Sequence, residues 1–253
     1  LHLGIMYYDG KGVVKDHTLA FEYLKKAIDS FLRLYSDENT LSDLDREECI
    51  YNKEYFKNAV VVVHEDTYAA VYATTPKSEK AIVCILGTGS NCSYFDGKVL
   101  HQKVQSLGYI AMDDCSGNRF GRHLIRAYYF NKMPKELAQE FEEEYNVDAD
   151  YIKHNLYKEP NPNAYLATFA KFLIRHKDTE FCQKFIQKEM EAFVENYIEQ
   201  FENCKEVPVH FIGSIAFYLK DELTSILEKR GITIGNVLRR PIDGLIEYHI
   251  LNK

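Results

Sequence analysis

The chain has 253 residues, of which 46% are hydrophobic and 27% charged, and its net charge is −7. This composition is that of a globular protein with enough material for one large domain or two small ones. The acidic charge argues against duplex nucleic acid and anionic membranes as main partners, because both attract basic surfaces. No apolar run approaches the roughly 20 residues that span a bilayer, so we expect no membrane segment.

The N-terminus and the cysteines bear on the cellular compartment in which we expect the protein. The N-terminus carries no basic-then-apolar signal pattern, and it begins with Leu1 rather than Met, which is consistent with a fragment that lacks upstream sequence. The six cysteines form no C-x-x-C pair, which argues against zinc and iron–sulfur sites. We therefore expect reduced thiols and a cytoplasmic location.

Residues 1–30 read as two helices around a Gly-Lys-Gly turn. One stripe of an amphipathic helix has the spacing i, i+3, i+4 and i+7, and consists of Ala20, Tyr23, Leu24 and Ala27. The segment resembles one SEL-like repeat, a relative of the tetratricopeptide repeat. A single repeat cannot bury its own apolar face. We expect either further repeats upstream or packing on the rest of the protein, and the resemblance implies a protein-binding element.

A charged connector follows at residues 31–57, where Ser42 can cap a helix, and we assign it no chemistry. From residue 58 the pattern becomes α/β. Continuous apolar runs predict buried strands at residues 59–63 and 81–86. Two further strands are expected at 207–212 and 233–238. A hairpin with an Asp-Gly turn is predicted over 94–100. Helical patterns cover a segment that opens with His64-Glu65-Asp66 and runs through Ala73, most of 117–205, and residues 215–230 and 242–251.

The stretch Gly87-Thr88-Gly89-Ser90-Asn91 follows the predicted strand at 81–86. Two glycines let backbone amides approach a phosphate closely, because no Cβ intervenes. The hydroxyl and amide side chains of this stretch add further donors. An ordinary hairpin turn has the same composition, so both interpretations remain open here.

Three more places could carry chemistry. Asp66 follows a predicted buried strand and can accept a hydroxyl proton, although an acid in a first helical turn is also simply favourable there. Asp113 and Asp114 precede a helix and could hold a sugar hydroxyl or metal-bound water, or Asp114 or Ser116 could only cap that helix. The Gly213-Ser214 turn could pass close to a nucleoside, or be a simple tight turn.

Together these motifs resemble the N-acetylglucosamine kinases and the BadF/BadG/BcrA/BcrD ATPase group of the actin-like ATPase superfamily. The resemblance covers residues 58–253, and its most specific stretches are CILGTGSN, LGYIAMDDCSGNRFGRHLI, VPVHFIGSIAFYLKDEL and PIDGLIEYH. It implies a ribonuclease H-like α/β lobe with helical insertions, here preceded by a short N-terminal α-hairpin. The domains would then be residues 1–30, 31–57 and 58–253.

The resemblance also implies roles for individual residues. Asp66 matches the general base of an ATP-dependent amino-sugar kinase. The phosphate and ATP contacts match Gly87, Thr88, Gly89, Gly213, Ser214 and Ala216. The sugar contacts match Ser90, Asn91 and Asp113. ATP with Mg²⁺ would be the phosphate donor, no metal ligand is assigned, and family members often form homodimers.

Two departures from the family pattern favour a different function. The family has Gly-Asp-Glu-Gly where this chain has Met112-Asp113-Asp114-Cys115, and we expect the two new side chains where backbone would approach the sugar. The family's first lobe begins with an Asp-x-Gly-Ser/Thr-x-x-Thr hairpin, which this sequence lacks. The alternative is therefore a non-catalytic module that binds sugar or nucleotide or acts as a scaffold, with the helical repeat binding a protein.

Overall fold

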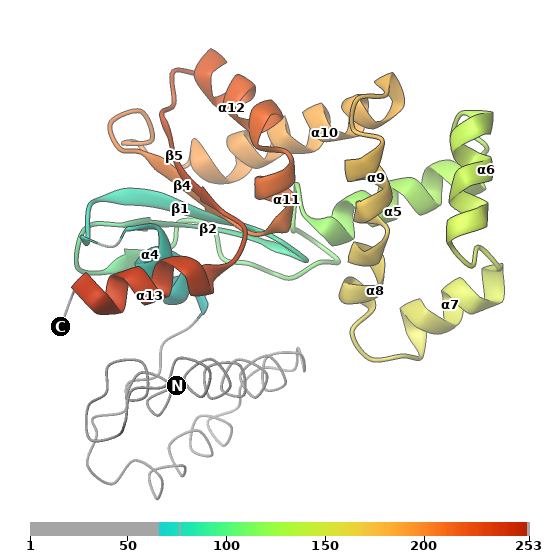
Figure 1. The fold of residues 1–253 in the computed structure, drawn as a ribbon, viewed down its shortest axis with the longest axis horizontal. Coiled ribbons are helices and arrows are strands. Elements are labelled where there is room, and N and C mark those ends of the chain that lie inside the picture. Colours follow the sequence, from blue (N-terminus) through green and yellow to red (C-terminus); the bar gives the residue numbers. More distant parts are fainter. Residues whose placement is uncertain (1–65, 76, 252–253) are drawn as a thin grey trace, which may run out of the picture. The chain divides into compact units, whose positions relative to one another are not determined.

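The computed structural model describes residues 66–75 and 77–251. The predicted SEL-like repeat (1–30), the connector (31–57) and the first predicted strand (59–63) lie outside these residues. Within them the fold is mixed α/β, as expected, with a single five-stranded sheet flanked by helices (Figure 1). No helix in this part of the chain is long and apolar enough to cross a membrane.

The sheet has the strand order β3-β2-β1-β4-β5. The strands are β1 (Ala81–Leu86), β2 (Ser90–Phe95), β3 (Leu100–His101), β4 (Val209–Ile212) and β5 (Ile234–Leu238). β1 pairs with β4 and β4 with β5 in parallel, whereas β2 and β3 extend the sheet in antiparallel fashion. The predicted Asp-Gly turn is confirmed between β2 and β3, where the Asp96 carboxylate accepts from the amides of Lys98 and Val99.

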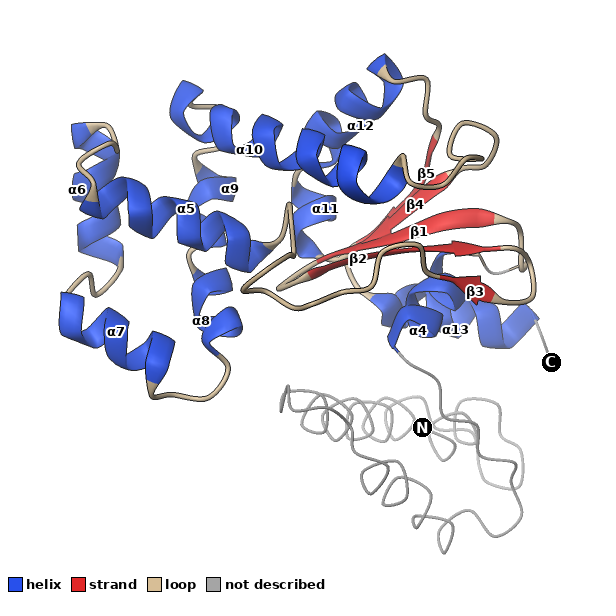
Figure 2. Ribbon diagram, turned by 180° about the vertical axis from the view of Figure 1, so that it is seen from behind, coloured by secondary structure: helices blue, strands red, loops and turns tan. Residues whose placement is uncertain are grey.

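Helices fill most of the chain between β3 and β4, as the amphipathic patterns predicted. This helical segment contains α5 (Gly117–Tyr129), α6 (Lys135–Glu144), α7 (Ala149–Tyr157), α8 (Pro162–Thr168), α9 (Ala170–Arg175), α10 (Glu180–Phe193) and the π-helix η2 (Val194–Ile198). Around the sheet lie α4 (Asp66–Thr74), α11 (Ser214–Tyr218), α12 (Lys220–Lys229) and α13 (Pro241–Leu251). Figure 2 shows α6 and α7 at the end of the helical segment that is farthest from the sheet.

Each face of the sheet has its own apolar core, because successive side chains of a strand point to opposite faces. Ala81 and Val83 of β1 face α4 and α13 in the smaller core. Ile82 and Cys84 face the larger core, which includes side chains of α5 and α10. A continuous apolar run therefore marks β1, since both of its faces are covered.

The predicted helix at 215–230 is two helices, α11 and α12, which meet at Leu219. The Leu219 amide closes α11 on the Ile215 carbonyl, and the Leu219 carbonyl accepts from Leu223 in α12. Leu219 is fully buried and lies outside the α-helical region (φ −110°, ψ 29°). The sequence has no glycine or proline here, so its local pattern did not predict the break.

Helices α5 and α8 approach most closely at Gly121. A Cβ placed there would lie 1.8 Å from the carbonyl oxygen of Leu166. The obstructing atom belongs to a helix backbone, which cannot rotate aside as a side chain can. Gly121 therefore sets the distance between the two helices.

We expect Gly121→Ala to lower the free energy of unfolding by about 1–3 kcal/mol or more, because the added methyl overpacks this contact. Urea denaturation of the full chain measures the effect. Ser225→Ala on the exposed face of α12 is the control and should change the value by less than about 0.5 kcal/mol. Equal stability of the Gly121 variant and wild type would contradict the close packing of α5 on α8.

Candidate functional site

Gly87, Thr88 and Gly89 form the loop that joins β1 to β2. The Gly87 amide donates to the Gly89 carbonyl at 3.0 Å, which closes the loop. Ser90 and Asn91 already belong to β2 and pair with Leu86 and Ile85. The motif is therefore a hairpin turn, and its ability to hold phosphate depends on where its backbone amides point.

The first turn of α5 determines the orientation of this loop. The amide of Gly117 donates to the Gly87 carbonyl at 2.7 Å, and the amide of Asn118 donates to the Thr88 carbonyl at 3.0 Å. In a trans peptide the carbonyl and the following N–H point in opposite directions. The amides of Thr88 and Gly89 consequently point away from α5. Neither amide donates a hydrogen bond to any group within residues 66–75 and 77–251, so both are available to an anion.

Asp113 lies directly against this loop. Its Oδ2 accepts from Nδ2 of Asn118 at 2.9 Å, and the same Nδ2 donates to the Thr88 carbonyl at 2.7 Å. A Cβ on Gly89 would lie only 2.7 Å from that Oδ2. Glycine at position 89 thus leaves the space that the carboxylate occupies. Asp113 is 7% exposed and adopts φ 64°, an uncommon conformation for a residue with a Cβ.

The Gly213 turn packs against the end of β1, where the same loop begins. Gly213 has φ 119°, and a Cβ there would lie 2.3 Å from the Leu86 carbonyl oxygen. Only glycine permits this conformation and this approach. Ser214 is exposed beside it, whereas the side chain of Ala216 lies in the larger core. The structure therefore brings together three of the predicted motifs: the Gly87–Gly89 loop, Asp113 and Gly213.

Asp66 approaches the loop from the other face of the sheet. It is the exposed first residue of α4, and its neighbour Thr67 lines a small depression together with Ile85 and Asn91 near the end of the hairpin. Asp66 therefore begins the helix that covers the α4 face of the sheet. Asp113 comes from the α5 side.

Ser90 and Asn91 do not form a common sugar contact through their side chains. They are adjacent residues of one strand, so their side chains leave opposite faces of the sheet. The Asn91 side chain is on the α4 face, where its Oδ1 accepts from the Cys92 amide at 2.7 Å and from Gln102 at 3.1 Å. The Ser90 side chain is buried on the face of the larger core.

The paired acids of the sequence also separate. Asp114 turns away from Asp113: its Oδ2 accepts from Asn196 at 2.9 Å, and its Oδ1 lies 3.6 Å from Nη2 of Arg119. The helix is capped by Ser116, whose hydroxyl accepts from the Arg119 amide. The sequence left Asp114 and Ser116 as the two candidate caps of this helix, and the structure confirms Ser116. Asp114 instead forms an ion pair with Arg119.

Cys115 does not obstruct the site as we expected from its place in the family pattern. Cys115 adopts φ 58°, a conformation that favours the glycine found at this position in the family pattern. Its side chain is fully buried in the larger core. Burial raises the pKa of the Cys115 thiol well above its ordinary value. Met112 likewise packs against this core, and its sulfur accepts from the Leu107 amide. The two substitutions affect backbone strain and core packing rather than access to the loop.

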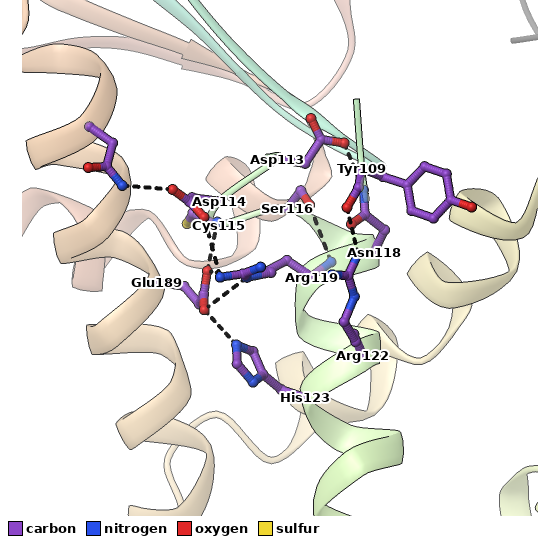
Figure 3. Close-up of polar contacts among 11 residues, drawn as sticks. Tyr109, Asp113, Asp114, Cys115, Ser116, Asn118, Arg119, Arg122, His123 and Glu189 are labelled. Carbon is purple, nitrogen blue, oxygen red and sulfur yellow. Dashed lines mark hydrogen bonds and ion pairs between the residues drawn. The ribbon is translucent and has the colours of Figure 1, made fainter. Parts of the chain in front are cut away.

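One buried residue near the site escaped the sequence analysis. Glu189 of α10 accepts from the Cys115 amide at 3.4 Å and contacts the side chains of Arg119 and His123 (Figure 3). The available signal was a charged residue within the apolar stripe formed by Ile186, Met190 and Phe193. Its partners are more than 60 residues away in sequence, so periodicity could mark Glu189 as unusual but could not identify them.

No family model and no curated protein matches the chain. A solved structure from Porphyromonas gingivalis, described as a "putative N-acetylglucosamine kinase", matches with 37% identity and a TM-score of 0.68. The match covers 73% of this chain but 64% of that protein, so the chain spans less than two thirds of this relative.

A second structure with the same description, from Chromobacterium violaceum, matches with 17% identity and a TM-score of 0.57. It covers 79% of this chain and 70% of that protein, and at this identity it shows a shared fold alone. The described part of the chain therefore has a mixed α/β fold of the actin-like ATPase type, which it shares with structures described as "putative N-acetylglucosamine kinase".

Proposed function

We propose that the chain is an ATP-dependent amino-sugar phosphotransferase of the N-acetylglucosamine kinase type. The observation that carries this proposal is the meeting of three motifs: the free amides of Thr88 and Gly89, the Asp113 carboxylate and the Gly213 turn. Two backbone donors suit a phosphate, and a buried carboxylate suits a sugar hydroxyl. The description of the P. gingivalis relative names the same reaction class.

In the proposed reaction the sugar hydroxyl oxygen attacks the γ-phosphorus of ATP. The bond from that phosphorus to the β–γ bridging oxygen breaks, and ADP leaves. Asp66 accepts the hydroxyl proton, and its place at the N-terminus of α4 favours the ionised carboxylate that this requires. The remaining task of the protein is to position the reactants, since phosphoryl transfer needs little covalent chemistry from the enzyme.

The other residues have roles in binding. We assign the Gly87–Gly89 loop to phosphate, Asp113 with Ser90 or Asn91 to the sugar, and the turn at Gly213, Ser214 and Ala216 to the nucleotide. Mg²⁺ typically binds such sites through phosphate oxygens, waters and one or two carboxylates. In the part of the chain that the structure describes, no three His, Cys, Asp or Glu residues cluster as metal ligands. Mg²⁺ bound with ATP would supply neutralisation of the phosphate charge.

A binding module without turnover is the second candidate. The hydrogen bonds that hold the loop and Asp113 together come from Asn118 and the start of α5, so they form without Asp66. Ligand binding could thus persist where catalysis does not. The division into residues 1–30, 31–57 and 58–253, a protein partner for the SEL-like repeat and a homodimer stay predictions from the resemblance.

We expect Asp66→Asn to lower kcat/KM for N-acetylglucosamine by about 10²–10⁴-fold, because the variant cannot accept the hydroxyl proton. Coupled ADP release measures the rate. Asp150→Asn is the matched control, since Asp150 is also an exposed acid in the first turn of a helix, and it should leave the rate unchanged. If wild type and the Asp66 variant show the same background rate, the catalytic proposal fails and ligand-dependent thermal shifts decide the binding alternative.

Gly89→Ala and Gly87→Ala separate the role of Asp113 from that of the loop. A methyl at position 89 displaces the Asp113 carboxylate, whereas a methyl at 87 meets no atom within 4 Å. Losing one hydrogen bond to a charged group weakens binding by about 10- to 150-fold. We expect the Gly89 variant to lose its sugar-dependent thermal shift and the Gly87 variant to keep it. Retention by both would remove Asp113 from the sugar site.

A further inference from the structure

The buried carboxylate of Glu189 is part of neither the loop nor the sheet, yet it contacts the segment that carries Asp113. We propose that Glu189 is a positioning residue that holds the Asp113–Cys115 segment, so that α10 of the helical insertion sets the affinity of the site for its sugar. This inference rests on the proposed function, because it assumes that Asp113 binds the sugar.

Glu189 is almost completely enclosed, with 1% of its surface exposed. Its oxygens accept from Nε of Arg119 at 3.1 and 3.2 Å and contact Nε2 of His123 at 2.5 Å. Oε2 also accepts from the Cys115 amide at 3.4 Å. A buried carboxylate is costly unless charged and polar partners surround it, and these contacts provide both.

The segment that Glu189 holds is strained. Asp113 and Cys115 both have a positive φ, 64° and 58°, although neither is glycine. This conformation costs each residue about 1–2 kcal/mol, so it persists only where neighbouring contacts enforce it. The contacts on this segment include the bond of Asn118 to Asp113 and the bond of Asn196 to Asp114. Glu189 adds the bond to the Cys115 amide (Figure 3).

Displacement of Cys115 would displace Asp113, because only one residue separates them. The Asp113 carboxylate accepts a hydrogen bond from the side-chain amide of Asn118. It also lies so close to Gly89 that a Cβ there would be 2.7 Å from its Oδ2. Glu189 itself bonds to the backbone on the far side of this segment. It therefore acts on the sugar through Asp113 and has no direct contact with the reacting atoms.

The central test is Glu189→Gln, which keeps the shape of the side chain but places a neutral amide against Arg119 and His123. Glu180→Gln is the control, because Glu180 lies on the same helix and is exposed. We expect the KM for N-acetylglucosamine to rise about 10- to 100-fold, as for a misplaced binding group, while the KM for ATP changes less than twofold. The control should match wild type. An unchanged sugar KM, or an equal rise in both KM values, would overturn the proposal.

A second measurement separates this inference from the proposed function. If wild type shows neither turnover nor a sugar-dependent thermal shift, the proposed function has failed, and hydrogen–deuterium exchange then decides the role of Glu189. We expect amides of residues 113–117 to exchange at least tenfold faster in the Glu189 variant, while β1 keeps its protection. Unchanged exchange at 113–117, or equal acceleration throughout, would contradict a positioning role.

The pH dependence of stability tests whether the ion pairs form. Burial alone would raise the pKa of Glu189, but the His123 bond, the charges of Arg119 and His123 and the Cys115 amide outweigh it and lower the pKa. Among the described residues, Arg122, Asp113 and Asp114 are further charged groups near this cluster. A lowered pKa stabilises the fold above the pKa of unfolded glutamate, about 4.3, and this stabilisation is lost as pH falls through the folded value.

We therefore expect the free energy of unfolding of wild type to fall more steeply between about pH 5 and pH 3 than that of the Glu189→Gln variant. Urea denaturation at each pH measures both proteins. The Glu180→Gln variant should follow the wild-type curve. Parallel curves for wild type and the Glu189 variant would show that the carboxylate is not ion-paired, and the proposal would lose its physical basis.

Discussion

The hydrogen bonds from the first amides of α5 to the Gly87 and Thr88 carbonyls are the contacts on which the site depends. A helix leaves its first amides without partners inside the helix. In this protein two of them bond to a loop 30 residues earlier in the chain. Because each peptide unit is planar and trans, the same bonds turn the Thr88 and Gly89 amides outward. The first turn of α5 therefore fixes the orientation of the loop and of its two outward amides.

Asp113 and the Gly213 turn lie against the loop that these hydrogen bonds hold. Asn118, in the first turn of α5, bonds to the loop and to Asp113 with one amide nitrogen. Glycine at 89 leaves room for the Asp113 carboxylate, and glycine at 213 lets its turn contact the Leu86 carbonyl. Glu189 supports the same arrangement from behind through the Cys115 amide. The Gly87–Gly89 loop and Asp113 are thus joined by hydrogen bonds, and α10 contacts the segment that carries Asp113.

Several parts of this arrangement were predictable because they depend on local chemistry. A continuous apolar run identified β1, the Asp-Gly pair marked the turn after β2, and Ser116 was one of two predicted caps for α5. Other predictions needed the packed structure. The opposite directions of Ser90 and Asn91 follow from where β2 begins, and the buried thiol of Cys115 follows from the path of its segment. Matching residues to a family motif shows neither the direction of a side chain nor whether it is buried.

By itself the sequence determined which residues are available: the two glycines of the loop, the acids at 66 and 113, and the Gly213 turn, because φ requirements, capping and apolar periodicity act over a few neighbouring residues. Only the tertiary structure decided which of these meet. It placed Asp113 and Gly213 against the loop, Asp66 on the α4 face, and Glu189 behind Cys115. The physical reason is that such meetings depend on hydrogen bonds and packing between segments tens of residues apart, for which the local pattern contains no signal.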